Sequence, residues 1–335
     1  MDELSVGLVA GKENVEAFIV EATPFGRLRP GDRRLVEDND GPGLVRSLDG
    51  PLRASTDLVG DAWLGCLANA AAKLVFGLPA TQLVVGIAVD GEVRDGGQTV
   101  MPAGLFSAIE DAPARLLREF KGRGIEVKGP PVFVDHAVAW ARGESTSALG
   151  SLAEGVRGLL LVWGRHVRWV AVAADGLTEQ LNADLGENSL GFDGLDVAYA
   201  RQRGTDLPSP ILSSARHGDP VACELLRKAA ETLAQGAVVR LGDDRRLVLS
   251  GILGRAALDE RLRAHLREPF EDLLDGPGNQ ANTREVEDSD GSAVHVSREE
   301  AAPAIGAVAL ARAADQGRHT DSGGTRGEPS GESTP

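Results

Sequence analysis

Three basic side chains beside a single glycine form a grouping in this sequence that could bind an anion. Arg165, His166 and Arg168 follow Gly164 and lie between two apolar runs. Guanidinium and imidazolium groups donate short hydrogen bonds to phosphate or carboxylate oxygens, so one hypothesis is an anion-binding turn. The alternative, which we favour, is a solvated turn beside an edge strand, because connecting segments usually lie on the surface.

The sequence does not indicate a metal site or a disulfide. Cys66 and Cys223 lie far apart and show neither CxxC nor Cys/His spacing. Four histidines are equally isolated from other potential ligands: His217, His265, His295 and His319. We therefore expect no zinc, and free thiols of this kind suit a reducing cytoplasm.

The charge of the chain disfavours partners that are polyanions. Its 335 residues include 50 acidic and 35 basic ones, for a formal net charge of −15. Nucleic acids and anionic membranes attract Lys and Arg, so we expect neither as a partner. The sequence has no basic leader and no apolar run of the about 18 residues that a membrane helix needs. A cytoplasmic protein is expected, and the excess of Arg, Ala and Gly suggests a bacterial source.

Two glycine-containing turns predict two hairpins that could carry a phosphate-binding site. Apolar, β-branched runs at 5–10 and 15–21 flank the turn from Gly11 to Asn14, and similar runs at 158–163 and 167–174 flank the second turn. The same pattern in both halves indicates two similar domains, each opened by a hairpin. Together with the helices below, this favours an α/β fold.

Further elements follow from periodicity and from cap residues. The clearest helix start is Asp219 followed by Pro220, an N-cap with proline at the first helical position. Strands are predicted at 84–89, 131–134 and 247–249, and helices at 57–76, 110–120, 219–233 and 258–274, with a last one from Pro303. Segments rich in Gly, Pro and charge predict loops at 29–56 and 275–292.

Three segments of the sequence resemble motifs of the ROK family of sugar kinases and repressors. Residues 131–144, PVFVDHAVAWARGE, are similar to the family's PVxVENDANxxAxGE. Residues 214–253 resemble xARxGDxxAxxLLxxAxxxLGxGLxxLxxxLDPexVVLGGGl, and residues 304–310 resemble the terminal xxLGAAAL helix. The motifs keep their order and spacing over roughly 4–314.

The resemblance implies an α/β protein with the two-domain actin-like ATPase (ribonuclease H-like) fold and a central cleft between the domains. We expect an N-terminal domain at 1–135 and a C-terminal domain at 136–315. The last helix, at about 303–315, is expected to pack back on the N-terminal domain. Residues 316–335 contain no large apolar side chain and are expected to be a disordered tail. The family's habit of dimerising makes a homodimer one expectation.

The phosphate-binding turns differ from the family pattern. The family's GIDIGGTKIEAALV reads GLVAGKENVEAFIV, so Val9, Lys12 and Glu13 replace an Asp, a Gly and a Thr. Glu13 beside a phosphate would cost about 4 kcal/mol at an effective dielectric near 20, and Lys12 would offset part of this. The resemblance assigns nucleotide binding to Gly11 and Lys12.

The other nucleotide motifs are reduced in the same way. In the second turn the family's LGTGIGGG retains one glycine, Gly164, and Arg165 follows it. The adenine-side GGG reads Ser250-Gly251-Ile252. By resemblance, Gly164, Arg165 and Gly251 are the remaining nucleotide-binding candidates.

The position of the catalytic base is altered as well. Alignment from Gly143-Glu144 places His136 at the family's catalytic Asp, and a shift of one residue would place Asp135 there. Either side chain could accept the proton of a sugar hydroxyl. The alternative, which we slightly prefer, is that both residues lie at a strand end and cap the next helix.

The sugar-binding motifs retain few of their polar groups. The family's GExGH reads Gly186-Glu187-Asn188-Ser189-Leu190, which keeps the Glu and loses the His, and the run of three zinc-binding cysteines is absent. The family's GVPG reads Ala88-Val89-Asp90-Gly91 in this chain. Glu187 and Asp90 are therefore the candidates for sugar binding, and no metal site is predicted.

Damage to every phosphate motif favours a ROK-type protein that has lost efficient ATP-dependent phosphorylation. Such a protein would act as a ligand-binding, regulatory or structural pseudokinase, with a sugar as its expected small-molecule ligand. The alternative is an active hexose or amino-sugar kinase that uses Mg-ATP, with Asp135 or His136 as the base and Arg165 or Arg168 on phosphate. The repressor branch is disfavoured, because the first strand begins at about residue 5 and leaves no room for a helix-turn-helix domain.

Overall fold

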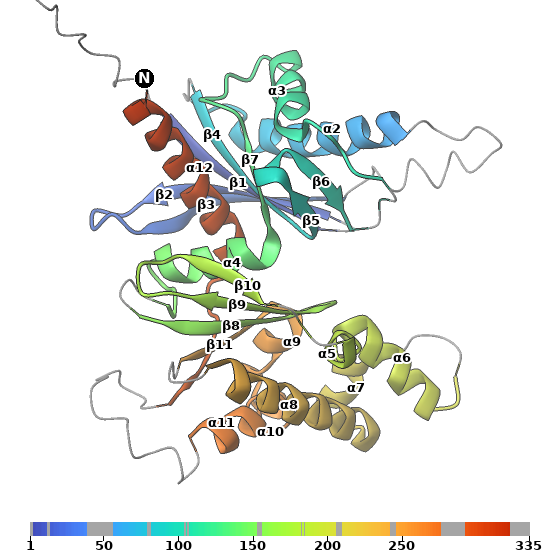
Figure 1. The fold of residues 1–335 in the computed structure, drawn as a ribbon. Coiled ribbons are helices and arrows are strands. Elements are labelled where there is room, and N and C mark those ends of the chain that lie inside the picture. The colour runs from blue at the N-terminus through green and yellow to red at the C-terminus, as the bar shows by residue number, and fades with distance from the viewer. Residues whose placement is uncertain are drawn as a thin grey trace, which may run out of the picture. The chain divides into compact units, whose positions relative to one another are not determined.

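The computed structural model describes most of the chain: residues 3–11, 14–38, 56–78, 82–103, 105, 107–152, 156–181, 183, 185–205, 210–241, 246–275 and 292–321. The chain forms two compact units (Figure 1). Unit 1 comprises Met1–Glu21, Gly31–Val134 and Ala307–Pro335, and unit 2 comprises Ala22–Pro30 and Asp135–Gly306.

Unit 1 is built on a five-stranded sheet in the order β3-β2-β1-β4-β7. Its strands are β1 Glu3–Ala10, β2 Asn14–Ala22, β3 Leu28–Asp38, β4 Gln82–Val89 and β7 Val132–Asp135. The predicted first hairpin is confirmed, because β1 pairs antiparallel with β2. On its other side β1 pairs parallel with β4, with Ala10 opposite Val89. A short ribbon follows β4 and consists of β5 Gly91–Arg94, the 3-10 turn η1 Asp95–Gly97 and β6 Thr99–Pro102.

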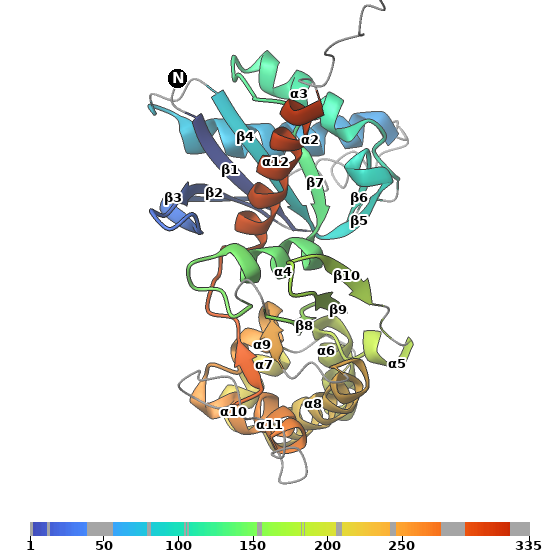
Figure 2. The same cartoon turned by 60° about the vertical axis from the view of Figure 1, so that its left-hand side comes forward.

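Helices pack on both faces of the unit 1 sheet. Alternate residues of β1, Val6 and Leu8 among them, join the core formed with α2 (Thr56–Val75) and α3 (Ala112–Gly122). The opposite face carries α12 (Ala302–Asp321), whose Arg312 Nε donates to Ser5 Oγ of β1 at 3.0 Å. Figures 1 and 2 both show α12 on the face of the sheet away from α2. The period-two alternation of β1 thus separates the two helical layers.

Unit 2 repeats the same strand order in a second sheet, β10-β9-β8-β11-β12. Its strands are β8 Gly158–Trp163, β9 Val167–Val172, β10 Thr178–Leu181, β11 Leu247–Ser250 and β12 Val294–Val296. The predicted second hairpin is confirmed by the antiparallel pairing of β8 with β9, and β8 pairs parallel with β11. The repeated hairpin that the sequence indicates is therefore part of a repeated five-stranded sheet.

The helices of unit 2 also form two layers. On one face α4 (His136–Thr146) packs through Trp140 against Val162 and Val170. On the other face lies a core around Trp163 and Trp169. The helices that follow α4 in unit 2 are α5 Leu185–Asn188, α6 Phe192–Gln202, α7 Ile211–Arg216, α8 Pro220–Leu241, α9 Gly251–Ala256, α10 Glu260–Leu266 and α11 Glu268–Leu274.

The predicted start of α8 is confirmed at the level of its cap. Asp219 Oδ1 accepts hydrogen bonds from the backbone N–H groups of Val221 at 2.9 Å and Ala222 at 3.1 Å. These bonds satisfy two of the donors that the first turn of a helix leaves without an intrahelical partner. They also lower the pKa of Asp219 below its ordinary value.

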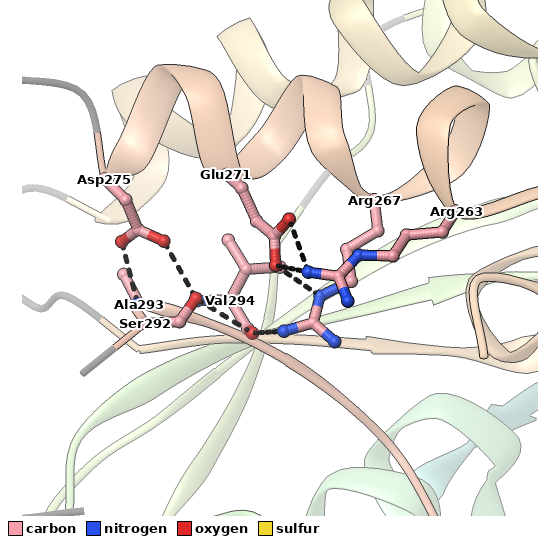
Figure 3. Close-up of polar contacts among 7 residues, drawn as sticks. All are labelled: Arg263, Arg267, Glu271, Asp275, Ser292, Ala293 and Val294. Carbon is pink, nitrogen blue, oxygen red and sulfur yellow. Dashed lines mark hydrogen bonds and ion pairs between the residues drawn. The ribbon is translucent and has the colours of Figure 1, made fainter. Parts of the chain in front are cut away.

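The single helix predicted at 258–274 is wrong, because the structure contains two helices that meet at Arg267. Pro269 lies in the first turn of α11, where its missing N–H costs no helical hydrogen bond. In place of a continuous helix, Arg267 donates to the Val294 carbonyl at 3.2 Å and pairs with Glu271 at 2.6 Å (Figure 3). The division into α10 and α11 therefore coincides with the contact between Arg267 and β12.

The end of α11 is joined to the start of β12 by a second set of contacts in Figure 3. The Asp275 carboxylate accepts hydrogen bonds from Ser292 Oγ and from the Ala293 N–H, both at 2.8 Å. The predicted loop at 275–292 falls mostly outside the described residues, and its two described ends are tied together here.

Two predicted irregular segments are partly regular in the structure. Residues 29–38 belong to β3, because pairing with β2 supplies partners for the backbone whatever the side chains are. Residues 316–321 continue α12, because adding a turn to a formed helix costs less than starting one. The remaining parts of these two predictions, 39–55 and 322–335, lie outside the described residues. No described helix has both the length and the hydropathy to cross a bilayer.

Candidate functional site

Asp135, one of the two candidates for a base, has both carboxylate oxygens engaged. It is the N-cap of α4, where Oδ1 accepts from the N–H groups of Ala137 at 2.8 Å and Val138 at 3.4 Å. Oδ2 accepts from Arg168 Nη1 of β9 at 2.7 Å. Asp135 therefore caps α4, as the alternative from the sequence predicts for it, and its role as a base stays a prediction.

The Asp135–Arg168 pair is partly shielded from water. The Asp135 side chain is 15% exposed and the Arg168 side chain 18% exposed. Removal of one partner from such an ion pair costs several kcal/mol, because the other charge is left without a counter-ion. The pair holds Asp135 on α4 and occupies one of the arginines predicted as a phosphate ligand.

His136, the other candidate base, is the first residue of α4. Its ring lies edge-on to the ring of Trp140, with centroids 5.3 Å apart and planes at 88°. This is an ordinary aromatic contact one turn along a helix. The role of His136 as a base stays a prediction.

Glu187, the surviving glutamate of the sugar motif, forms a buried ion pair. It lies in α5, is 6% exposed, and its two oxygens each accept from a different Nη atom of Arg240 in α8 at 2.9 Å. Trp169 Nε1 donates to Glu187 Oε2 at 3.2 Å, and the Arg240 guanidinium lies 4.9 Å from the Trp169 ring centroid. The bidentate pair and the indole donor hold the Glu187 carboxylate in a fixed position.

The second glycine turn is covered by the connection between α5 and α6. Gly164 N–H donates within its own turn to the His166 carbonyl at 3.2 Å, and the Gly164 carbonyl accepts from Phe192 N–H at 2.8 Å. A Cβ at Gly191 would overlap the Arg165 carbonyl. Because Gly164 N–H is paired within the chain, it does not point at a ligand as the N–H groups of a phosphate cradle do.

Gly251, the adenine-side candidate, is brought against the same turn. Its φ is +77°, and a Cβ there would lie 2.7 Å from the Trp163 carbonyl oxygen and 3.1 Å from Gly164 N. Glycine is required here by a left-handed backbone and by close approach to the end of β8. Arg165 of the turn pairs with Asp193 at 3.6 Å. The structure thus brings Gly164, Arg165 and Gly251 together in unit 2.

In unit 1 the structure brings together Gly11 and Asp90. Gly11 N–H donates to the Asn14 carbonyl at 2.9 Å, which closes the first hairpin turn, and Asp90 N–H donates to the Ala10 carbonyl at 2.9 Å. Both residues therefore follow the carboxyl ends of the parallel strands β1 and β4, the edge at which α/β sheets bind ligands. Lys12 and Glu13 lie outside the described residues.

Sequence reasoning missed the partners of the two candidate carboxylates. Arg168 lies 33 residues from Asp135, and Arg240 lies 53 residues from Glu187. The sequence indicates Arg168 only as a candidate anion or phosphate ligand, and Arg240 carries no signal, since an arginine in a long helix is ordinary. A sequence signal for Trp169 exists in the alternation of β9, which places it on the face opposite Arg168.

Glu144, the last residue of the 131–144 motif, is completely buried. It accepts hydrogen bonds from the Ser297 hydroxyl and from the Ser151 N–H, the latter at 2.8 Å. Burial raises the pKa of Glu144 above its ordinary value of 4.5. Trp140 Nε1 donates to Ser297 Oγ at 3.3 Å, so this carboxyl joins α4 to the segment that leads into α12.

Among the described residues, no group of three or more His, Cys, Asp or Glu is placed to hold a metal ion.

Comparison with known proteins identifies the fold. The chain matches no protein-family profile and no curated protein. It is similar to a ROK family glucokinase from Streptomyces griseus in complex with glucose and AMPPNP, at 17% identity and a TM-score of 0.63, over 92% of this chain and 99% of that one. For the ROK hexokinase from Thermus thermophilus the values are 16% and 0.60, over 94% and 99%.

A regulator has the same architecture. The chain is similar to a ROK family transcriptional regulator, a homologue of E. coli MLC, at 11% identity and a TM-score of 0.60, over 92% of this chain and 78% of that one. The chain therefore has the two-domain actin-like ATPase fold of the ROK sugar kinases, as its motifs predict.

Proposed function

We propose that this protein uses the sugar-kinase fold without efficient phosphoryl transfer, as a ligand-binding, regulatory or structural protein. The observation that carries the proposal is the engagement of Asp135, whose oxygens bind Arg168 and the first turn of α4. A general base must offer a free lone pair to the substrate hydroxyl, within hydrogen-bond reach. Asp135 accepts two hydrogen bonds at Oδ1 and one from Arg168 at Oδ2, and these partners hold the carboxylate in place.

The groups that would handle Mg-ATP also fit it poorly. Phosphoryl transfer depends on positioning and on electrostatic stabilisation of the phosphates, which backbone N–H groups, cations and metal ligands supply. The N–H groups of Gly11 and Gly164 donate within their own turns, and Val9 stands where the family has a carboxylate. We therefore derive no catalytic step through Mg-ATP for this chain.

A sugar remains the ligand class to test first. The similar structures include a glucokinase with glucose, a protein with sucrose and an N-acetylmannosamine kinase candidate. In this chain Glu187 is paired with Arg240, which makes a sugar contact through Glu187 costly. Asp90, at the carboxyl edge of the unit 1 sheet, is the candidate that could contribute to a sugar site.

The proposal is tested by calorimetry with Mg-ATP and with glucose, mannose and N-acetylmannosamine, together with an assay for ADP release. We expect no ATP binding tighter than about 1 mM and no sugar-dependent ADP release. Sugar binding without ATP binding would indicate a sensor. ATP binding accompanied by turnover would overturn the proposal and support an active hexose or amino-sugar kinase with an altered site.

The variant Asp135→Ala separates the structural role from the catalytic one. We expect it to lower the free energy of unfolding by about 1 kcal/mol or more, through loss of the cap and the ion pair, and to leave ADP release unchanged. The matched control is Asp61→Ala, which removes an ion pair with Arg115 on the surface of unit 1. It should change stability by about 0.5 kcal/mol or less. Loss of a measurable turnover in Asp135→Ala alone would contradict the proposed role.

A further inference from the structure

A cavity of about 310 Å³ lies in unit 2 between α6 and α8, apart from the candidate residues described above. Figures 1 and 2 show these two helices near one another on the same side of the unit 2 sheet. Leu190 and Leu195 contribute apolar wall from the α6 side, and Leu225 and Ala229 contribute it from α8. Val197, also in the wall, is 39% exposed although it is a β-branched apolar residue.

The charge of this cavity is opposite to that of the chain. Among the described residues that line it, two are basic, Arg201 and Lys228, and none is acidic. The chain as a whole carries a formal net charge of −15. Lys228 pairs with Glu224 at 3.3 Å, whereas the guanidinium group of Arg201 has no hydrogen bond or ion pair with the described residues. A guanidinium beside an apolar wall suits a ligand that carries an anionic end and an apolar body.

We propose that the cavity between α6 and α8 binds a small apolar carboxylic acid. The carboxylate would pair with Arg201 and lie near Lys228, and the apolar body would cover the wall that includes Leu195 and Val197. The volume lies at the lower end of the range for small-molecule sites, so the ligand is a compact molecule with an aromatic ring or a short alkyl chain. The proposal does not depend on whether the protein transfers phosphate.

The position of the cavity gives its ligand a route to the rest of unit 2. The Leu190 carbonyl accepts from Trp163 Nε1 at 2.8 Å, and Leu190 N–H donates to the Glu187 carbonyl at 2.9 Å. A ligand that displaces Leu190 therefore changes the surroundings of the Trp163 indole. We expect the tryptophan emission to shift on binding, and the variant Trp163→Phe to remove that shift without removing binding.

The test is isothermal titration of the full-length protein with 4-phenylbutyrate, octanoate and indole-3-acetate. We expect at least one of them to bind with a Kd between about 0.1 and 1 mM, and its neutral alcohol analogue to bind at least about tenfold more weakly. Binding that ignores the negative charge would overturn the assignment of Arg201. The absence of binding by all three acids at 5 mM (about five times the weakest expected Kd) would overturn the proposal.

Variants of the wall and the rim locate the site. Arg201→Gln is expected to weaken binding about tenfold, Lys228→Gln by less, and Ala198→Phe, which fills the cavity from α6, to abolish it. The matched control is Arg227→Gln, the neighbour of Lys228 on α8, which removes the same charge outside the cavity wall and should leave Kd unchanged. If Ala198→Phe fails to fold, Arg201→Gln and Lys228→Gln still test the location of the site. Equal Kd values for Arg201→Gln and the control Arg227→Gln would refute the site.

Discussion

The two five-stranded sheets share one strand order, but they differ in the residues that follow the matching strands β4 and β11. In unit 1 the strand β4 is followed by Asp90, whose N–H bonds to the Ala10 carbonyl, and then by the ribbon of β5 and β6. In unit 2 the strand β11 turns at once into α9 through Gly251, which packs against the end of β8. The shared strand order therefore does not determine the residue type after the strand. That residue type depends on the connection that follows, which is a ribbon in unit 1 and a helix in unit 2.

The comparison shows that the fold alone can require a glycine at a motif position. Gly251 matches a glycine of the nucleotide motif, yet its φ of +77° and its contact with Trp163 already require glycine. At the corresponding place in unit 1, Asp90 follows the strand without such a constraint. The match of Gly251 to the motif is therefore not by itself evidence for ligand binding.

In each unit a glycine allows the backbone of the helix α12 to approach closely. A Cβ at Gly143 of α4 would overlap the Ala302 carbonyl at the start of α12 in unit 2. A Cβ at Gly86 of β4 would overlap backbone atoms of Ala307 in unit 1. The polar groups nearby differ: buried Glu144 belongs to the first contact, and Lys128 bridges Glu3 and Asp315 beside the second.

The largest effect is expected from filling these two glycine positions. Gly143→Val and Gly86→Val should each lower the free energy of unfolding by about 3 kcal/mol or more, because backbone atoms cannot move aside as a flexible side chain can. Chemical denaturation monitored by circular dichroism measures the loss. Gly122→Ala is the control, since a Cβ at Gly122 meets no atom within 4 Å. Tolerance of valine at either position would show that α12 does not pack there as described.

The next effect concerns the ends of β11 and β4. Gly251→Ala should cost about 2 kcal/mol, from the left-handed backbone and from the 2.7 Å approach to the Trp163 carbonyl. Asp90→Ala should cost less than Gly251→Ala, since the backbone of Asp90 is not left-handed. Thermal unfolding of both variants measures the difference. Equal losses would remove the contrast between the two strand ends.

A pH dependence is expected from Glu144, which joins α4 to the segment before α12. Burial raises its pKa in the folded protein, so the folded state binds the proton more tightly than the unfolded state. The stability that this provides is fully present below about pH 4.5 and is lost as the pH rises through the folded pKa. Denaturant titrations at a series of pH values should show a smaller decline in Glu144→Gln than in the unaltered protein. A parallel decline in both would contradict the prediction.

The smallest effect distinguishes two helix starts. Helix α3 in unit 1 begins after Asp111, whose φ is +50° and whose side chain makes no cap hydrogen bond. Asp111→Gly should change the free energy of unfolding by about 0.5 kcal/mol or less, because relief of the strained backbone opposes the greater freedom of the unfolded chain. Asp219→Ala in unit 2 should lower the unfolding temperature measurably, since it removes the cap of α8. A larger loss at Asp111 than at Asp219 would reverse this assignment.

Much of the local structure could be predicted because its causes lie in neighbouring residues. The two hairpins follow from β-branched runs around glycine turns, and the start of α8 follows from Asp219 and Pro220. The strand β3 and the division at Arg267 could not be predicted. The first depends on pairing with β2, and the second accompanies a contact with Val294 of β12. In both cases tertiary context outweighs local preference.

The candidate site divides in the same way. The sequence by itself determined which residues stand at the motif positions and that the fold is that of the ROK sugar kinases. Only the tertiary structure decided that Asp135 binds Arg168 and that Glu187 binds Arg240, because residues 33 and 53 positions apart meet through the packing of strands and helices. No local pattern encodes such a meeting, and ion pairs of this kind decide whether a carboxylate at a motif position is available for chemistry.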